Sequence, residues 1–302
     1  MRWSIASVLT FALLAHVSLA VAKPSPDQLM DAPVLREPSA YRFNTLELDS
    51  ADAARHYRIW IGQPASVTVD TPVAYLLDGN AAMAALDIDG LNRLAKSPAP
   101  PVLVAVGYAT PLRIERTART FDYTPNVAGA AQQRDPLTNV PSGGADVFLD
   151  LLTHTIRPQI NQLLRVTPKR QLLWGHSYGG LLVLHTLLTR PELFQAYAAA
   201  SPSLWWHNGV IDAERVGLER RLQGSRPTLL LMRGELEPAS PVAATQPQVA
   251  ADAAAKHVLA SLQNIGRLQT QYTVFPGLGH GPMLQASLRY TLESLSQQQP
   301  RP

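Results

Sequence analysis

Short apolar runs, each followed by a segment of helical length, recur along this chain from residue 73 onward. Each run is four or five residues long and holds mostly apolar side chains in succession rather than in alternation. Such runs are typical of strands that are buried on both faces of a mostly parallel sheet. The strands predicted from this pattern are residues 73–77, 102–106, 171–174, 196–200, 228–232 and 271–275.

Two earlier segments show a different pattern. Residues 41–48 and 56–61 alternate apolar and polar side chains, which predicts an antiparallel pair at one edge of the sheet. Apolar positions at helical spacing predict helices at 81–94, 146–164, 180–188, 249–265 and 282–295. We therefore expect one doubly wound α/β domain with a mostly parallel sheet and antiparallel N-terminal edge strands.

Residues 109–144 interrupt this alternation. They are rich in arginine, proline, threonine and glycine and have no clear periodicity. A loop this long in a compact domain is usually functional or disordered. Because it connects a strand to the helix before strand 171–174, we expect it to cover the carboxyl edge of the sheet, where open α/β sheets bind ligands.

The N-terminus has the features of a signal peptide. Arg2 is followed by an apolar run at 5–14 and by an A-x-A cleavage site at 20–22, so cleavage is expected to leave residues 23–302 as a single domain. An uncleaved membrane anchor is the alternative, but the run is short and His16 interrupts it. Residues 23–39 hold several prolines and are expected to form an extended lead-in. No later stretch is long and apolar enough to span a membrane, so we expect no stable membrane insertion after cleavage.

Composition narrows the classes of function. Of the 302 residues, 46% are hydrophobic, which supports a sizeable core. Charged residues make up 16% with a net charge of +3 and no block of like charge, so binding to nucleic acid is not expected. The absence of cysteine excludes disulfides, thiolate metal ligands and a cysteine nucleophile. An exported protein of this size without disulfides is expected in the bacterial periplasm.

A G-x-S-x-G motif at residues 175–179 carries the candidate nucleophile, Ser177. An apolar strand leads directly into the motif and an apolar helix leads directly out of it. This strand–turn–helix context is the one that a nucleophile elbow requires, because the serine must stand on a tight turn above the sheet. An ordinary glycine-rich connection between a strand and a helix is the alternative.

A serine hydroxyl needs a base, and His280 is the histidine in the expected place. It follows the last predicted strand and precedes a helix that Pro282 opens. The remaining histidines of the mature chain fit less well, and His176 is expected to point away from the base position. The acid is expected after strand 228–232, where Glu237 is the first candidate and Glu235 the second. Either carboxylate could instead be a solvated loop charge.

The expected oxyanion hole combines two backbone N–H groups. One belongs to Tyr178, the residue after the nucleophile. The other is that of Asn80, which follows the Asp-Gly turn after strand 73–77. These groups predict a serine hydrolase of the α/β-hydrolase fold, whose chemistry involves no metal or organic cofactor.

Five motifs resemble the putative-esterase branch of the α/β-hydrolases, and within it the periplasmic siderophore esterases that open the trilactones enterobactin and salmochelin. They are LLDGNAAM from Leu76, FDYTP from Phe121, GHSYGGLL from Gly175, SPSLWW from Ser201 and GLGHGPM from Gly277. The resemblance implies that Ser177 and His280 are the catalytic pair and that Arg119 lies near the anionic ferric siderophore. Since some members use a Ser–His dyad, the resemblance leaves the acid open.

The covering loop suits such a substrate. A ferric tris-catecholate carries three negative charges, so Arg113, Arg116 and Arg119 could meet its charge while Tyr123, Trp205 and Trp206 pack on catechol rings. Alternatively the arginines keep the loop soluble and the tryptophans pack in the core. The expected partner is therefore a small-molecule ester. Two other functions stay open: a periplasmic carboxylesterase for other acyl or feruloyl-type esters, and a catalytically idle fold that binds a siderophore or a partner protein.

Overall fold

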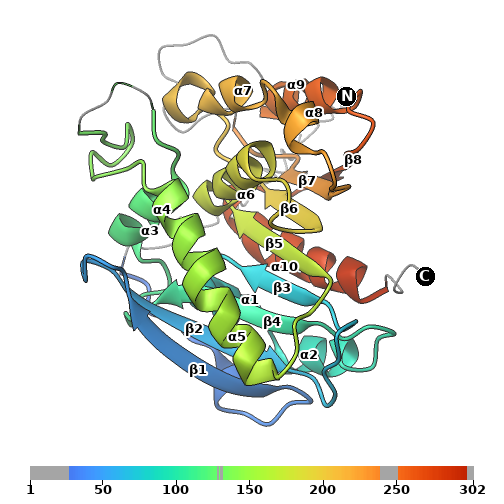
Figure 1. The fold of residues 1–302 in the computed structure, drawn as a ribbon. Helices are drawn as coiled ribbons and strands as arrows, with labels where there is room; N and C mark the ends of the chain where they lie inside the picture. Colours follow the sequence, from blue (N-terminus) through green and yellow to red (C-terminus); the bar gives the residue numbers. More distant parts are fainter. Residues whose placement is uncertain (1–26, 128, 130–131, 239–250, 298–302) are drawn as a thin grey trace, which may run out of the picture.

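An eight-stranded sheet with the order β1-β2-β4-β3-β5-β6-β7-β8 forms the centre of the molecule (Figure 1). The computed structural model describes residues 27–127, 129, 132–238 and 251–297, so the predicted signal peptide lies outside the described residues. Pairing is antiparallel between β1 and β2 and between β2 and β4, and parallel elsewhere, as the alternating and continuous apolar patterns predict. The strands are β1 (Arg42–Asp49), β2 (His56–Gln63), β3 (Val73–Leu76), β4 (Val102–Tyr108), β5 (Gln171–His176), β6 (Ala196–Ala200), β7 (Thr228–Gly234) and β8 (Gln269–Phe275).

Helices cover both faces of this sheet, with α5 and α6 on one side and α10 on the other (Figure 1). Successive residues of β3 point to opposite faces: Tyr75 joins the core beneath α5 and α6, whereas Leu76 joins the core beneath α1, α2 and α10. The helices are α1 (Gly79–Ala85), α2 (Ile88–Leu94), α3 (Arg116–Tyr123), α4 (Ala145–Leu151), α5 (Arg157–Leu164), α6 (Tyr178–Thr189), α7 (Val210–Glu214), α8 (Leu218–Arg221), α9 (Ala251–Leu262) and α10 (His280–Gln297).

Two of the predicted helices are built differently from the prediction. The single helix expected at 81–94 is two helices, because the chain becomes extended at Leu86 and Asp87 then caps α2 by accepting a hydrogen bond from the N–H of Gly90 (2.6 Å). The helix expected at 146–164 is continuous, but a π-helical turn, η2 (Leu152–Ile156), separates α4 from α5.

The segment 109–144 contains a helix that the sequence did not indicate. Glu115 caps α3 by accepting from the N–H of Ala118, and the helix presents Thr120, Asp122 and Tyr123 to the interior. Because its buried face is largely polar, α3 lacks the apolar periodicity by which helices are predicted. The expectation of a long loop without regular structure was therefore wrong for residues 116–123.

The N-terminal lead-in is also more ordered than predicted. Val34, in the short 3-10 helix η1 (Pro33–Leu35), is 2% exposed and belongs to the core beneath α10. Leu29 forms an antiparallel bridge with Leu112, so the lead-in is tied to the start of the segment 109–144. Within the described residues, no helix has the length and apolarity needed to cross a bilayer.

Candidate active site

Ser177 stands on the turn between β5 and α6, in a backbone conformation that few residues adopt. Its φ and ψ are 61° and −117°, and its N–H donates to the carbonyl of Ala200 on the neighbouring strand (3.0 Å). The turn is tight enough that a Cβ on Gly175 would lie 2.4 Å from the main chain of Gly179. Gly175 is therefore required by close backbone approach, as expected for a nucleophile elbow, whereas a Cβ on Gly179 would make only an ordinary contact with Leu77 (3.4 Å).

His280 is the first residue of α10 and lies between Ser177 and an acid. Its Nε2 is 3.0 Å from Ser177 Oγ, and its Nδ1 is 3.2 Å from Glu237 Oε2. A carboxylate can only accept, so Nδ1 carries the proton and Nε2 is free to accept the serine proton. The three predicted residues thus form a continuous hydrogen-bonded line from three separate strand ends, and this geometry is that of a Ser–His–acid triad.

The loop after β7 holds Glu237 in this line. Its second oxygen, Oε1, accepts from Ser201 Oγ (2.6 Å) and from the N–H of Gly234 (2.5 Å). Burial acts to raise the pKa of Glu237, but the hydrogen bonds from His280, Ser201 and Gly234 outweigh it and lower the pKa. Glu235, the second candidate, instead accepts from the N–H of Gly277 and so braces the loop before His280.

His176 supports the base from the end of β5, a role that the sequence analysis missed. The ring is 6% exposed, and its Nε2 donates to the carbonyl of His280 (2.9 Å). Burial, together with the neighbouring His280, lowers the pKa of His176 well below its ordinary value, so this ring is neutral. Its position next to the nucleophile was the available signal, since a residue there lies under the catalytic loop.

Only one of the two residues predicted to supply an oxyanion donor lines the cavity. The N–H of Tyr178 lies at the start of α6, directly after Ser177, and Tyr178 lines the same cavity as Ser177. Asn80 is 2% exposed, and its side-chain amide bonds to Tyr108, the last residue of β4, and to Thr110 in the loop that follows. From that loop it is Asp78, not Asn80, that lines the cavity, and the N–H of Asn80 stays a prediction.

Ser177 opens into a cavity of about 610 Å³ at the carboxyl edge of the sheet. This volume is ordinary for a site that encloses a small molecule. Among the described residues, four arginines but only two carboxylates line it, so two positive charges of this lining remain uncompensated. These charged residues are Arg113, Arg116, Arg119, Arg233, Asp78 and Glu237.

The three predicted substrate arginines differ in how they are held. Arg119 donates to both oxygens of Asp78, with distances of 2.7 and 2.8 Å, and this bidentate pair is largely buried. Arg113 is half-buried and Arg116 is exposed, and no ion pair within the described part of the chain involves either of them. Burial lowers the pKa of Arg113. Arg119 is therefore largely committed to Asp78, whereas Arg113 and Arg116 keep their charge available to a ligand.

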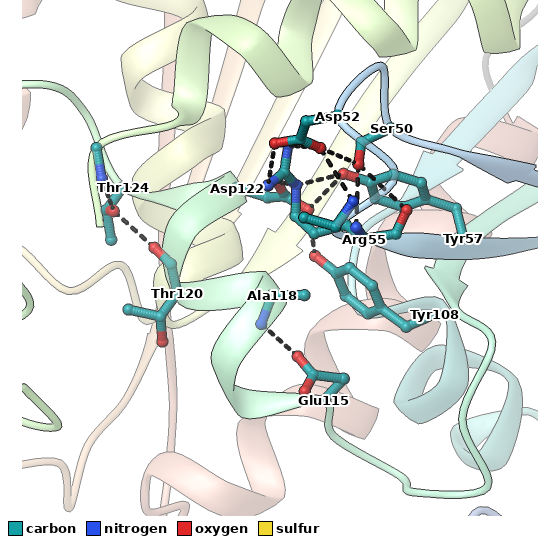
Figure 2. Close-up of polar contacts among 12 residues, drawn as sticks. Ser50, Asp52, Arg55, Tyr57, Tyr108, Glu115, Ala118, Thr120, Asp122 and Thr124 are labelled. Atoms are coloured by element: carbon teal, nitrogen blue, oxygen red, sulfur yellow. Dashed lines mark hydrogen bonds and ion pairs between the residues drawn. The ribbon is translucent and has the colours of Figure 1, made fainter. Parts of the chain in front are cut away.

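Tyr123 was predicted to contact substrate, and the structure contradicts this. It is fully buried, and its hydroxyl oxygen accepts a hydrogen bond from the backbone N–H of Asp78, in the turn after β3 (2.9 Å). The next residue back, Asp122, accepts from Tyr57 and Tyr108 (2.9 Å each) and pairs with Arg55 (3.1 Å), as Figure 2 shows. The FDYTP motif thus fastens α3 to β2, β4 and the turn after β3.

The two tryptophans also separate. Trp205 is partly buried and lines the cavity, as predicted. Trp206 is fully buried, and its indole N–H donates to Asp135 (2.9 Å), so the prediction that it contacts substrate was wrong. The two consecutive tryptophans face opposite sides of this turn, and the sequence did not indicate which of them faces the cavity. Among the described residues, no group of three His, Asp or Glu side chains is arranged to hold a metal ion.

This strand order, with a serine on the turn after β5 and a histidine after β8, places the chain among the α/β-hydrolase-fold enzymes. More narrowly, the chain belongs to the Esterase family, described as "Putative esterase", whose match spans residues 50–289.

Individual relatives agree with this family. The chain is 36% identical over 270 residues to the apo-salmochelin esterase of Escherichia coli O6:H1, which covers 85% of this chain and 80% of the relative. It is 34% identical over 202 residues to the ferri-bacillibactin esterase BesA of Bacillus subtilis, which covers 63% of this chain and 69% of the relative. The solved structure of the enterobactin hydrolase IroE in complex with DFP is similar with a TM-score of 0.68 at 35% identity, over 87% of this chain and 98% of that one.

Proposed function

We propose that this protein is a periplasmic serine esterase that hydrolyses the ester bonds of a ferric catecholate siderophore trilactone of the enterobactin type. The observation that carries the proposal is the line from Ser177 through His280 to Glu237, which opens into a cavity with surplus positive charge. The names of the relatives, esterases for salmochelin and bacillibactin, support the same substrate class.

In the proposed mechanism Ser177 Oγ attacks the ester carbonyl while His280 Nε2 takes the serine proton. Glu237 holds the His280 ring and stabilises the imidazolium that forms. The N–H groups of Tyr178 and Asn80 are assigned to the oxyanion. Collapse of the tetrahedral intermediate releases the alcohol, which receives the proton from His280. Water then attacks the acyl-enzyme with His280 again as base, and this step regenerates Ser177.

Electrostatics favours an anionic substrate over a neutral ester. Arg113 and Arg116 line the cavity, and neither forms a salt bridge among the described residues, although Asp78 attracts Arg113 from a greater distance. A ligand with negative charge would therefore gain contacts that a neutral ester would not. Trp205 offers an aromatic surface in the same cavity for a catechol ring. Iron belongs to the substrate in this proposal, and the protein contributes no metal ligand.

Export and cleavage after Ala22 are part of the proposal, with residues 23–302 acting as one domain in the periplasm. N-terminal sequencing of the protein recovered from a periplasmic extract is expected to begin at Lys23. A chain that keeps residues 1–22 and stays with the membrane fraction would contradict cleavage.

The substrate is tested by mass analysis of reaction products. The exported protein is incubated with ferric enterobactin, with iron-free enterobactin and with 4-nitrophenyl acetate, and Ser177→Ala serves as the control. We expect products in which the trilactone has gained one water for each ester cut. Cleavage of 4-nitrophenyl acetate without cleavage of either trilactone would identify a general carboxylesterase. Binding of the siderophore without any hydrolysis would identify an idle fold.

A further inference from the structure

Asp135 is a buried carboxylate above the active site that neither the motifs nor the proposed mechanism uses. It lies in the 134–141 hairpin, a short turn closed by the antiparallel bridge between Arg134 and Pro141. The N–H of Asp135 donates to Val140 (2.9 Å) and its carbonyl accepts from Asn139 (2.9 Å). Its side chain is inaccessible, since the residue is only 2% exposed.

Each oxygen of Asp135 serves a different part of the molecule. Oδ1 accepts from the N–H of Leu137 (3.1 Å) and from the N–H and hydroxyl of Thr138 (2.8 and 2.7 Å). Oδ2 accepts from the hydroxyl of Tyr178 (2.7 Å) and the indole N–H of Trp206 (2.9 Å). One carboxylate therefore joins the 134–141 hairpin to the first residue of α6 and to the segment after β6.

The charge of this carboxylate is well stabilised. Burial acts to raise the pKa of Asp135, but hydrogen bonds from Tyr178, Thr138 and Trp206 outweigh burial and lower it. An ionised carboxylate suits this set of donors, because both of its oxygens accept and neither donates. A neutral amide in its place could satisfy only one of the two sets of donors.

Of the four residues that donate to the Asp135 carboxylate, three line the cavity: Leu137, Thr138 and Tyr178. The fourth, Trp206, does not line it, but the residue before it in the chain, Trp205, does. Leu137 and Thr138 line it from the hairpin, and Trp205, whose ring centroid is 6.1 Å from that of Tyr178, lines it from the segment after β6. Leu137 is 51% exposed although it is a large apolar side chain. An exposed apolar side chain and a tryptophan that line the same cavity suit a flat aromatic ring, which would remove apolar surface of each from water.

We propose that Asp135 is a positioning residue that holds Leu137 and Trp205 as a subsite for an aromatic arm of the ester substrate. This inference rests on the proposed function for its substrate, but it concerns an aromatic group rather than the iron or the negative charge. It assigns selectivity to the hairpin and leaves bond cleavage to Ser177 and His280.

The first test is Asp135→Asn, which keeps the shape of the side chain. Whichever way the amide is turned, its NH₂ faces either the hairpin N–H groups or the donors of Tyr178 and Trp206. We expect KM for ferric enterobactin to rise about tenfold while kcat falls less than about threefold. The ratio of kcat/KM for N-benzoyl-serine methyl ester to that for N-acetyl-serine methyl ester is expected to fall about fivefold or more.

Leu137→Ala keeps the proposal testable if Asp135→Asn does not fold, because it disturbs no buried polar group. The matched control is Leu163→Ala on α5, since Leu163 is also partly exposed (39%) but does not line the cavity. We expect Leu137→Ala to lower the benzoyl-to-acetyl ratio about threefold and Leu163→Ala to leave it unchanged.

The two neutral serine esters separate this inference from the proposed function. If the wild-type protein does not cleave ferric enterobactin but both hairpin variants lose benzoyl preference, the siderophore proposal fails and the aromatic subsite stands. The inference is overturned if Leu137→Ala leaves the benzoyl-to-acetyl ratio unchanged. It is also overturned if a folded Asp135→Asn lowers kcat/KM for both esters by the same factor, because Asp135 then has a structural role only.

Discussion

The proposed catalytic line, Ser177–His280–Glu237, and the segment 109–144 that covers it are held in place by different interactions. Ser177, His280 and Glu237 sit on turns at strand ends, and backbone hydrogen bonds to Ala200 and Gly234 fix two of them. The covering segment 109–144 is instead held by hydrogen bonds to buried carboxylates. These are Asp78, Asp122 and Asp135, which are 5%, 1% and 2% exposed.

This difference separates the consequences of substitution. Ser177 is partly buried and His280 is exposed, so truncation of either side chain is expected to leave the fold intact and to act on the chemical step. A buried carboxylate that loses its partner leaves unsatisfied groups behind, which costs stability and displaces the cavity wall. Substitutions in the catalytic line are therefore expected to change kcat, and those in the covering segment to change substrate preference and stability.

The largest effect is expected from Ser177→Ala. Loss of the nucleophile should reduce kcat on the order of a millionfold, because the remaining oxyanion hole and binding contacts supply little of the rate. Ser203→Ala is the matched control, since Ser203 Oγ lies 3.5 Å from Ser177 Oγ and should retain activity within about tenfold. Activity above a few per cent in folded Ser177→Ala would contradict the assignment of the nucleophile.

The next effect tests the acid. Glu237→Gln is expected to lower kcat on the order of a hundredfold or more, because the amide does not stabilise the His280 imidazolium. Glu235→Gln should lower kcat much less, because among the described residues the Glu235 carboxylate bonds to the N–H of Gly277 and not to His280. Steady-state kinetics with circular dichroism as a check of folding would compare them. Near-wild-type turnover in Glu237→Gln would show that the enzyme works with a Ser–His dyad.

A smaller effect should distinguish the cavity arginines. Arg113→Gln is expected to lower kcat/KM for ferric enterobactin about tenfold, with the loss shrinking as salt rises, and to affect a neutral ester little. Arg119→Gln should lower kcat/KM for both the ferric siderophore and the neutral ester, because it leaves Asp78 buried without its partner. Salt-dependent kinetics on both substrates would measure this. If Arg119→Gln, and not Arg113→Gln, lowered kcat/KM for ferric enterobactin alone, Arg119 would be the substrate-binding arginine instead.

The smallest effect concerns stability rather than activity, on the helix that follows the nucleophile. His185 on α6 is 3% exposed and lies 2.8 Å from Glu214 and 3.5 Å from Asp146. Burial acts to lower the pKa of His185, but the ion pair with Asp146 and the hydrogen bond to Glu214 outweigh it and raise the pKa to about 9.

Because the folded-state pKa lies above the unfolded value, the protonated ring stabilises the fold fully below about pH 6.5. This stabilisation, on the order of 3 kcal/mol, should be lost as pH rises through about 9. Thermal melts from pH 6 to 10 should show a Tm that falls by several degrees more in the wild type than in His185→Gln. His154→Gln, an exposed histidine on η2, is the control and should keep the wild-type slope. If Tm fell with pH equally in the wild type and in His185→Gln, a protonated His185 between Asp146 and Glu214 would be refuted.

The sequence by itself determined the sheet, its antiparallel edge and the choice of Ser177 and His280 as the proposed nucleophile and base. Buried parallel strands need continuous apolar runs, and the elbow needs glycines at fixed positions beside Ser177, so both leave local patterns. The choice of Glu237 over Glu235 depended on how a loop folds, and the sequence could only rank the two.

Tertiary structure alone decided which polar residues face the cavity. Arg119 and Tyr123 turn toward Asp78, Trp206 turns toward Asp135, and α3 buries a polar face that has no apolar period. These contacts join segments that are 41 to 71 residues apart in the chain. A buried ion pair and a substrate-binding charge require the same residue types, and they differ only in whether a partner from another segment reaches them.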